Sequence, residues 1–272
     1  MPASESVALG SVQKTLLLPL WGRAVETHKA HPLLIDETAV RIIGSLPYDF
    51  TTISHGISPI TQLSWIARSL HIDRTLREFL DHHPDATVVN LGCGLDTTFE
   101  RVDNGRLTWY DLDLPDVIDL RRQFIAESDR RTFVSASLLE EDWLRQLKPA
   151  GPLFLIAAGV LYYFEEPQVR QLFTRLADVF PGCELIFDAC TAFGVKLANK
   201  KVIAAGGMDA SAILHWGLEH ARDLQAWDRR ITVREEYLIF HDFKSGHSLH
   251  DQWGMLMSDT LRVMSMVHLR FG

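Results

Sequence analysis

The chain has few cysteines, no long apolar run and no excess of positive charge. Its three cysteines, Cys93, Cys183 and Cys190, are too few and too poorly spaced for a disulfide framework or a cysteine zinc site. No run approaches the ~20 apolar residues that a membrane helix needs. The net charge of −8 argues against nucleic acid or an anionic membrane as the dominant partner.

The first ten residues also lack the basic and apolar regions of a signal peptide, so we expect a cytoplasmic protein. The 272 residues, 47% of them hydrophobic, fit one large α/β domain with a helical cap better than two independent domains. A chain of this size buries a large core without metal or disulfide staples. The sequence leaves the oligomeric state open, as a monomer or a homodimer.

The most informative segment is the turn that contains Gly92 and Gly94. The β-branched run before it, residues 87–90, predicts a buried parallel strand, and acidic residues return at Asp111 and Asp113. Glycines in such a turn let the backbone approach a ligand closely, and a carboxylate roughly 20 residues later is where such folds bind a ribose diol. The spacing therefore predicts a site for a cofactor that contains a nucleoside.

Strand-like and helix-like segments alternate after this turn, as in βαβ units on a parallel sheet. The expected strands lie near residues 87–90, 107–110, 132–134, 153–158, 184–187 and 260–271. Residues 1–84 read as helical, with a helix over 62–80 at their end, and residues 85–272 read as an α/β domain. Residues 191–230 look helical, which predicts either a lid or an ordinary outer helix layer.

Two nucleoside cofactors compete for the turn. A dinucleotide fold has a third glycine where this chain has Thr97, so that a helix N-terminus can hold the pyrophosphate. Asp96 would face that pyrophosphate, and the two negative charges would repel each other. S-adenosylmethionine has no phosphate, and carboxylates near the turn stabilise its cationic sulfonium and amine. The residues therefore favour S-adenosylmethionine over a nicotinamide dinucleotide.

Several blocks of the chain resemble the leucine carboxyl methyltransferase superfamily, and most closely its bacterial branch, the tetracenomycin polyketide O-methyltransferases. The blocks are Asn90–Thr97, Tyr110–Ile118, Ser135–Leu138 with Trp143, Gly159–Phe164 and, in the N-terminal region, Thr15–Glu26 with Pro47–Phe50. The resemblance covers roughly residues 11–270. It implies an α/β class I methyltransferase with a Rossmann-like, seven-stranded, mostly parallel sheet, helices on both faces and an N-terminal helical cap.

The resemblance also implies where S-adenosylmethionine binds. Arg68 matches the arginine that reaches the donor's carboxylate, and Arg23 a second one. Asp113 matches the acid that takes the ribose hydroxyls, with Asp111 as its rival, and the segment 137–138 flanks the adenine. With Asp96, the expected cofactor-binding residues are Arg23, Arg68, Gly92, Gly94, Asp96, Asp111, Asp113, Ser137 and Leu138.

One position departs from the family. Relatives have an acid just before the glycine of the fourth block, and this chain has Ala158 there. The change removes a charge-assisted contact of the kind that is worth ~1.5–3 kcal/mol. Compensation by Glu165 or Glu166 is one interpretation, and a donor-binding protein with weak or lost activity is another.

The methyl acceptor decides which side chains the reaction needs. A carboxylate arrives ionised and needs no general base, so Arg68, Tyr162 and Tyr163 are the candidates to orient it. A phenol would profit from a base, and His215 is the candidate. Each has a structural alternative: an ordinary ion pair for Arg68, core packing for one of the tyrosines, and a polar helix position for His215.

The predicted function is S-adenosylmethionine-dependent O-methylation of a carboxylate or phenol on a small acceptor, a polyketide-like or other secondary metabolite. Methylation of a protein's C-terminal carboxylate, as in the eukaryotic relatives, is the alternative, and the short chain weighs against it. No metal is expected, although His247 and His250 are spaced as ligands on one helical face would be.

Overall fold

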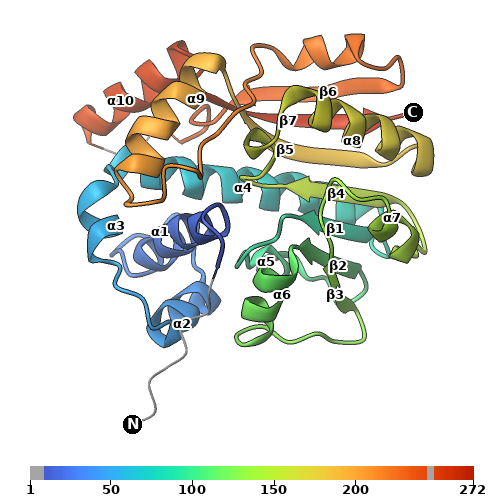
Figure 1. Ribbon diagram of the computed structural model, residues 1–272, viewed down its shortest axis with the longest axis horizontal. Coiled ribbons are helices and arrows are strands. Elements are labelled where there is room, and N and C mark those ends of the chain that lie inside the picture. Colours follow the sequence, from blue (N-terminus) through green and yellow to red (C-terminus); the bar gives the residue numbers. More distant parts are fainter. Residues whose placement is uncertain (1–8, 244–247) are drawn as a thin grey trace.

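A computed structural model describes residues 9–243 and 248–272. The strands in these ranges are β1 (Thr87–Leu91), β2 (Thr108–Asp113), β3 (Arg131–Ser135), β4 (Leu153–Ala157), β5 (Glu184–Cys190), β6 (Ile231–Leu238) and β7 (Met264–Phe271). They form one seven-stranded sheet in the order β3-β2-β1-β4-β5-β7-β6 (Figure 1).

The first five strands are parallel, and the sequence predicts each of them with small differences at the ends. β7 runs antiparallel between β5 and β6. The sequence did not predict β6, because Arg234, Glu235 and Glu236 interrupt any apolar pattern in this exposed edge strand. The expected seven-stranded, mostly parallel, Rossmann-like sheet is confirmed.

The α-helices are α1 (Leu17–Thr27), α2 (Glu37–Ser45), α3 (Thr51–Gly56), α4 (Pro59–His82), α5 (Thr98–Val102), α6 (Pro115–Arg122), α7 (Asp142–Gln146), α8 (Glu166–Val179), α9 (Ala192–Ala198) and α10 (Leu249–Thr260). Short helical turns of other types are η1 (Gln13–Leu16), η2 (Leu161–Tyr163), η3 (Asn199–Ala204) and η4 (Ala221–Ala226). Before β1 the described residues form helices and no strand, as the sequence predicts.

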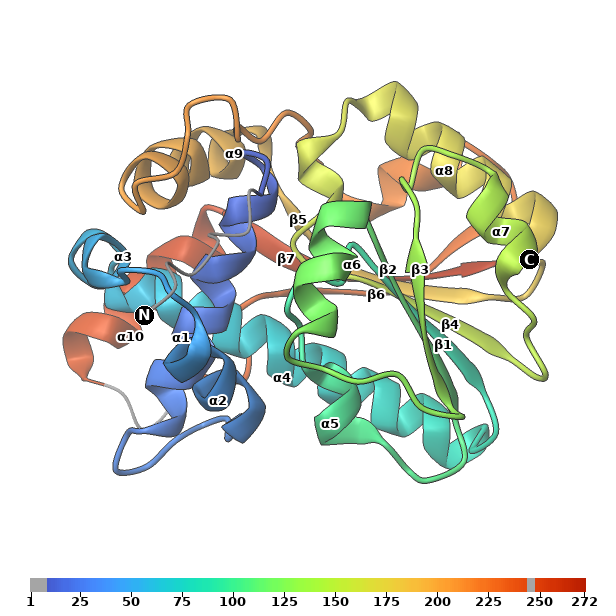
Figure 2. The ribbon, with the colours of Figure 1, turned by 60° about the horizontal axis from the view of Figure 1, so that its bottom comes forward.

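The central strand β4 shows how the sheet sorts its side chains between two layers. Phe154 and Ile156 lie in the hydrophobic cluster that contains residues of α4, and Leu155 and Ala157 lie in the cluster that contains residues of α8. The alternation follows from the two-residue repeat of a strand, and the continuous apolar run is needed because both faces are covered. Figure 2 shows α4 along one face of the sheet and α8 along the other.

Within the predicted cap, α4 covers the sheet, and α1 to α3, called the cap below, contact the loop that follows β1. α1 packs against α2 and α4, and the buried side chains of Leu20, Ala39 and Ile42 share a cluster with Leu95. Asp36 begins α2 by accepting a hydrogen bond from the N–H of Ala39, which satisfies a donor of the first helical turn. The cap is therefore anchored beside the turn where the sequence predicts the cofactor (Figure 1).

Residues 191–230 are less regular than the sequence indicates. α9, η3 and η4 are helical, whereas residues 205–220 contain no helix. Trp216 is buried in the main core cluster, and Trp227 packs against the same cluster. These tryptophans anchor the segment to the sheet, and its opening as a lid stays a prediction.

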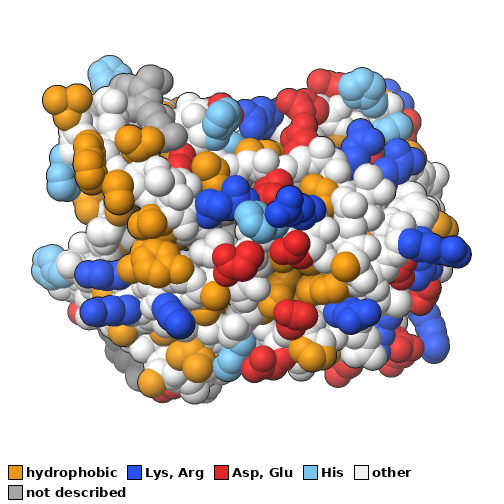
Figure 3. Space-filling view, turned by 90° about the horizontal axis from the view of Figure 1, so that it is seen from above, with side chains coloured by type: hydrophobic (Ala, Val, Ile, Leu, Met, Phe, Trp, Pro, Cys, Tyr) orange, Lys and Arg blue, Asp and Glu red, His pale blue; other side chains and the backbone are white. Residues whose placement is uncertain are grey.

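α10 leaves an apolar stripe exposed at one end of the molecule. Leu249, Trp253 and Leu256 are exposed, whereas Met255 on the same helix is buried. Figure 3 shows hydrophobic side chains gathered at this end and charged side chains of both signs intermixed over the rest of that face. None of the helices in the described ranges combines the length and the apolar character that a membrane crossing requires.

Candidate active site

A cavity of about 460 Å³ lies between the cap and the carboxyl ends of β1 to β4. The loops that follow these strands form one side, and residues of η1, α1 and α4 form the other. Open α/β sheets bind their ligands at this end of the strands, and the volume is in the ordinary range for a small-molecule site. The cavity is therefore the candidate site for the predicted cofactor.

The turn Gly92–Thr98, called the glycine turn below, forms part of the cavity wall. Gly92 has a φ of +64°, and a Cβ on this residue would lie 2.5 Å from Cγ2 of Val160. The left-handed backbone and the close approach both require glycine at this position. The chain can therefore turn sharply out of β1 and leave space for a ligand.

Asp113 ends β2 and lines the cavity. Its Oδ2 accepts a hydrogen bond from the N–H of Gly94 at 2.7 Å, and its Oδ1 accepts one from the N–H of Leu114 at 2.8 Å. Burial raises the pKa of Asp113 to about 6, although both N–H donors favour the ionised form. The lone pairs that remain can accept hydrogen bonds from hydroxyl groups of a ligand.

Asp111 is fully buried and does not line the cavity. Its Oδ1 accepts a hydrogen bond from Nε1 of Trp109 at 2.9 Å, and its Oδ2 accepts one from Nε of Arg131 at 2.7 Å. Nη2 of Arg121 lies 3.0 Å from the same Oδ2. Asp111 therefore neutralises buried cations, and we leave it out of the proposed donor site.

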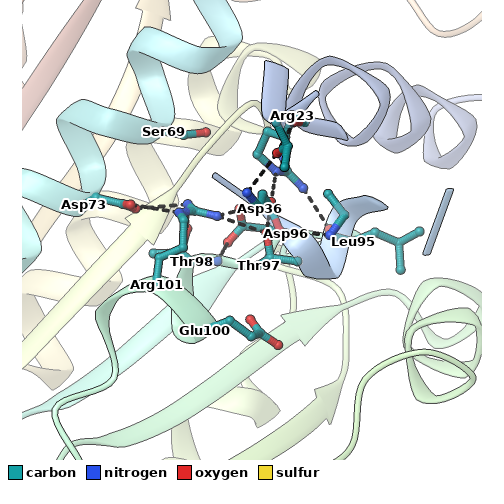
Figure 4. Close-up of polar contacts among 12 residues, drawn as sticks. Arg23, Asp36, Ser69, Asp73, Leu95, Asp96, Thr97, Thr98, Glu100 and Arg101 are labelled. Carbon is teal, nitrogen blue, oxygen red and sulfur yellow. Dashed lines mark hydrogen bonds and ion pairs between the residues drawn. The ribbon is translucent and has the colours of Figure 1, made fainter. Parts of the chain in front are cut away.

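Two arginines donate hydrogen bonds to backbone carbonyls of the glycine turn. Arg121 reaches the carbonyl oxygens of Gly94 and Asp96, both at 2.9 Å. Nη2 of Arg23 reaches the carbonyl oxygen of Leu95 at 2.9 Å (Figure 4). Hydrogen bonds from a charged donor are stronger than neutral ones, so these contacts fix the path of the turn.

Asp96, in the glycine turn, is one of the residues that line the cavity. Its Oδ2 accepts hydrogen bonds from Nδ2 of Asn90 and from the N–H of Thr98, both at 3.0 Å. Burial raises the pKa of Asp96, but the charges of Arg23 and Arg101 and the hydrogen bonds from Thr98 outweigh burial and hold this pKa well below its usual range. Asp96 therefore stays negatively charged.

Arg68 reaches the cavity from α4 and pairs with a buried carboxylate. Its Nη1 donates to Oδ2 of Asp188 at 2.9 Å and lies 3.4 Å from the hydroxyl of Tyr162. The N–H of Gly159 donates to Oδ1 of Asp188 at 2.6 Å. The carboxylate of Asp188, from β5, thus lies next to the loop that contains Ala158.

Tyr162 and Tyr163 both line the cavity, with their ring centroids 5.2 Å apart. The hydroxyl of Tyr163 donates to Oγ1 of Thr15 at 3.0 Å. Burial raises the pKa of Tyr163 to about 12 and raises that of Tyr162 well above its ordinary value. Both phenols are therefore neutral near pH 7, where they can donate hydrogen bonds but not act as bases.

His215, the candidate base, does not line the cavity. Its side chain is 38% exposed, and its Nδ1 lies 3.2 Å from Oε1 of Glu165. Its backbone N–H donates to the carbonyl oxygen of Tyr162 at 2.7 Å. Within the described part of the chain, no histidine is among the residues that line the cavity.

Comparison with known proteins identifies the family. The model of a family described as leucine carboxyl methyltransferase matches residues 17–177. The chain belongs to the leucine carboxyl methyltransferase family. It is 32% identical over 235 residues to the tetracenomycin polyketide synthesis O-methyltransferase TcmP of Streptomyces glaucescens, which covers 86% of this chain and 85% of TcmP. The family membership predicted from the sequence blocks is confirmed.

A second sequence relative and a solved structure of similar fold extend the comparison. The S-adenosyl-L-methionine-dependent methyltransferase dpfgK of Gibberella zeae is 26% identical over 259 residues, which covers 87% of this chain and 85% of dpfgK. The crystal structure of a DUF574 family protein from Streptomyces avermitilis has a TM-score of 0.61 at 13% identity and covers 93% of this chain and 97% of that one. The structural likeness shows the fold alone.

Most of the site residues predicted for this leucine carboxyl methyltransferase family member come together in one cavity. Those that line it are Arg23, Arg68, Gly92, Gly94, Asp96, Asp113, Ser137, Leu138, Tyr162 and Tyr163. Asp111 and His215 lie outside it. The sequence did not point to Asp36, Arg101 or Asp188, because their roles depend on partners far along the chain.

The sequence predicts no metal site, and His247 and His250 are the pair whose spacing would suit metal ligands. His247 lies outside the described residues, so the structure does not place it relative to His250. Within residues 9–243 and 248–272, no group of three or more His, Cys, Asp or Glu side chains is arranged to hold a metal ion.

The close approach at Gly92 predicts a selective loss of stability. Gly92 and Gly105 both have a left-handed φ, so alanine costs roughly 1 kcal/mol at either position through the backbone alone. Only at Gly92 would the new Cβ meet a side chain, that of Val160, whereas Gly105 faces open space. Urea unfolding should show a larger loss for Gly92→Ala than for Gly105→Ala, and equal losses would contradict this contact.

The buried position of Asp111 predicts a structural role. Asp111→Ala leaves the charges of Arg121 and Arg131 without their shared carboxylate, which should lower the free energy of unfolding by about 3–5 kcal/mol. The control Asp103→Ala removes the partner of Arg130 in a solvent-accessible ion pair and should cost much less than Asp111→Ala. Similar losses in urea unfolding would show that Asp111 is not the central counter-charge.

Proposed function

We propose that this protein is an S-adenosylmethionine-dependent O-methyltransferase whose acceptor is the carboxylate of a small molecule. The observation that carries the proposal is that one cavity combines Asp113 beside the glycine turn with Arg68 and two neutral tyrosines. The family and the names of its members support the methyl donor. The side chains of the cavity support the type of acceptor.

The donor side of the cavity fits S-adenosylmethionine better than a dinucleotide. Asp113 offers a carboxylate to the ribose hydroxyls, and Arg68 offers a positive charge to the donor's carboxylate. Asp96 remains ionised, which suits a cationic donor and opposes a pyrophosphate. Asp188 supplies the counter-charge of Arg68 near the position that Ala158 occupies. When bound, the donor supplies an electrophilic methyl group on its sulfonium.

The acceptor side lacks the group that a phenol would need. No histidine is among the described cavity residues, and both tyrosines are protonated near pH 7. A carboxylic acid with a pKa of about 4 arrives ionised and requires no base. Tyr162, whose hydroxyl accepts from Arg68, can then donate its own proton to orient an acceptor oxygen, whereas the hydroxyl of Tyr163 already donates to Thr15. In-line alignment is the main task of the protein.

In the proposed reaction, an acceptor oxygen forms a bond to the methyl carbon while the bond between that carbon and sulfur breaks. The electron pair of the broken bond stays on sulfur, and no proton is transferred. An anion and a cation thereby become a neutral ester and a thioether. A cavity that excludes water favours this loss of charge, because water would stabilise the separate ions more than the transition state.

The acceptor that we propose is a polyketide-like or other aromatic carboxylic acid. TcmP carries polyketide synthesis in its name, and the alignment covers most of both chains. A phenol is less well supported, because His215 lies outside the cavity. A protein C-terminal carboxylate and a donor-binding protein without turnover are the remaining alternatives.

Turnover on matched acceptors tests this proposal. With S-adenosylmethionine, the protein should convert at least one aromatic or polyketide-like carboxylic acid into its methyl ester and release S-adenosylhomocysteine, both measured by mass spectrometry. The methyl ester of the same acid should not react, since its carboxylate is already blocked. Methylation of a phenol that leaves a free carboxylate intact would contradict the acceptor assignment, and donor binding without product on a broad panel would support a binding protein.

The raised pKa of Asp113 predicts how donor affinity depends on pH. The ionised carboxylate accepts both ribose hydroxyls, whereas protonation removes an acceptor, so affinity for S-adenosylhomocysteine should fall as the pH drops through about 6. Calorimetry between about pH 7 and pH 5 measures this fall. Asp113→Asn should bind about tenfold more weakly at pH 7 and lose the pH dependence. Unchanged affinity in this variant would refute the ribose contact.

A further inference from the structure

Arg101 lies at the centre of a largely buried polar network behind the cavity (Figure 4). From α5, its Nε and Nη2 donate to the two carboxylate oxygens of Asp73 at 2.8 and 3.0 Å. Its Nη1 donates to Oγ1 of Thr97 at 2.9 Å, and its Nη2 also donates to Oγ1 of Thr98 at 3.0 Å. One guanidinium therefore joins α4 to the end of the glycine turn.

The same guanidinium reaches the cap through Asp36. Nη1 of Arg101 lies 3.4 Å from Oδ2 of Asp36. This oxygen also accepts hydrogen bonds from Nε of Arg23, at 2.8 Å, and from the hydroxyl of Thr97. The other oxygen of Asp36 accepts the N–H of Ala39 and so begins α2. Asp36 therefore connects α1, α2 and the glycine turn through its hydrogen bonds.

Each segment that Arg101 joins carries a residue of the cavity wall. α4 carries Arg68, α1 carries Arg23, and the glycine turn carries Asp96. Arg101 itself does not line the cavity. Any effect that it has on a bound donor must therefore act through these neighbours.

We propose that Arg101 is a positioning residue of the donor site, which holds Asp36, Asp73 and the end of the glycine turn together and so fixes Arg23 and Asp96 in the cavity wall. This inference rests on the proposed donor site. The planar guanidinium has five N–H donors spread over three nitrogens and can donate to all these partners at once. A lysine ammonium has only three donors on one nitrogen and cannot. The charge of Arg101 also helps to hold the pKa of Asp96 low.

A double-mutant cycle on the affinity for S-adenosylhomocysteine, measured by calorimetry, tests the inference. Arg101→Met should weaken binding by about tenfold or more, the scale of one lost charge-assisted hydrogen bond, and should raise the donor KM more than it lowers kcat. In an Arg23→Met background the same change should have a smaller effect, because one of the two groups through which it acts is gone and only the route through Asp96 remains. In an Asp113→Asn background it should keep its full effect.

Matched variants separate positioning from stability. Arg130→Met breaks a bidentate pair with Asp103 away from the cavity and should leave the affinity unchanged even where it lowers the melting temperature. Arg101→Lys keeps the positive charge but lacks the planar group with five N–H donors. Its affinity for S-adenosylhomocysteine should lie between those of the wild type and Arg101→Met. This variant also keeps the inference testable if Arg101→Met fails to fold.

Two outcomes would overturn the inference. One is wild-type affinity in folded Arg101→Met or Arg101→Lys protein, and the other is additivity of Arg101→Met with Arg23→Met. Failure of the proposed function itself would appear elsewhere, as a wild-type protein that does not bind S-adenosylhomocysteine. The wild-type measurement therefore distinguishes the two failures.

Discussion

The site depends on charged hydrogen bonds from arginine side chains to a short turn. Arg23 and Arg121 donate to the backbone carbonyls of the glycine turn, and Arg101 donates to its two threonine hydroxyls. A glycine-containing turn has many accessible conformations when it is free, so its shape must be set from outside. Guanidinium groups suit this role because each one serves several acceptors in a fixed geometry. The three arginines thereby hold the glycine turn in one conformation.

The two carboxylates near the end of β2 show how the environment assigns the role of one residue type. Asp111 lies within the strand, where an indole and two guanidinium groups use its oxygens. Asp113 lies at the strand end and lines the cavity, and two backbone N–H groups use only part of the hydrogen-bonding capacity of its oxygens. One carboxylate thus balances buried charge, and the other is available to a ligand. Their spacing in the sequence contains no sign of this difference.

Local patterns in the sequence predict the parallel half of the sheet well, because each strand there is a short apolar run between turns. The edge strand β6 is not predicted, since Arg234, Glu235 and Glu236 face solvent and its pairing comes from β7. The glycine spacing, the family blocks and the needs of the reaction point to ten of the residues that line the cavity, but they also point to Asp111 and His215, which lie outside it. They do not point to Asp36 and Asp188, because the roles of these residues arise only when distant segments meet.

Two contacts of the N-terminal region, one of them from η1 in the cavity wall, join residues that are far apart in the sequence. Thr15 meets Tyr163 across 148 positions of sequence, and the N–H of Gly10 meets Asp116 across 106. Contacts of such separation form late, since the entropy of closing a long loop must first be overcome. During synthesis, η1 and the helices of the cap therefore cannot make these contacts until β4 and the loop after it have been synthesised. A chain synthesised only as far as β3 therefore contains Thr15 but not Tyr163, and this side of the cavity wall is incomplete.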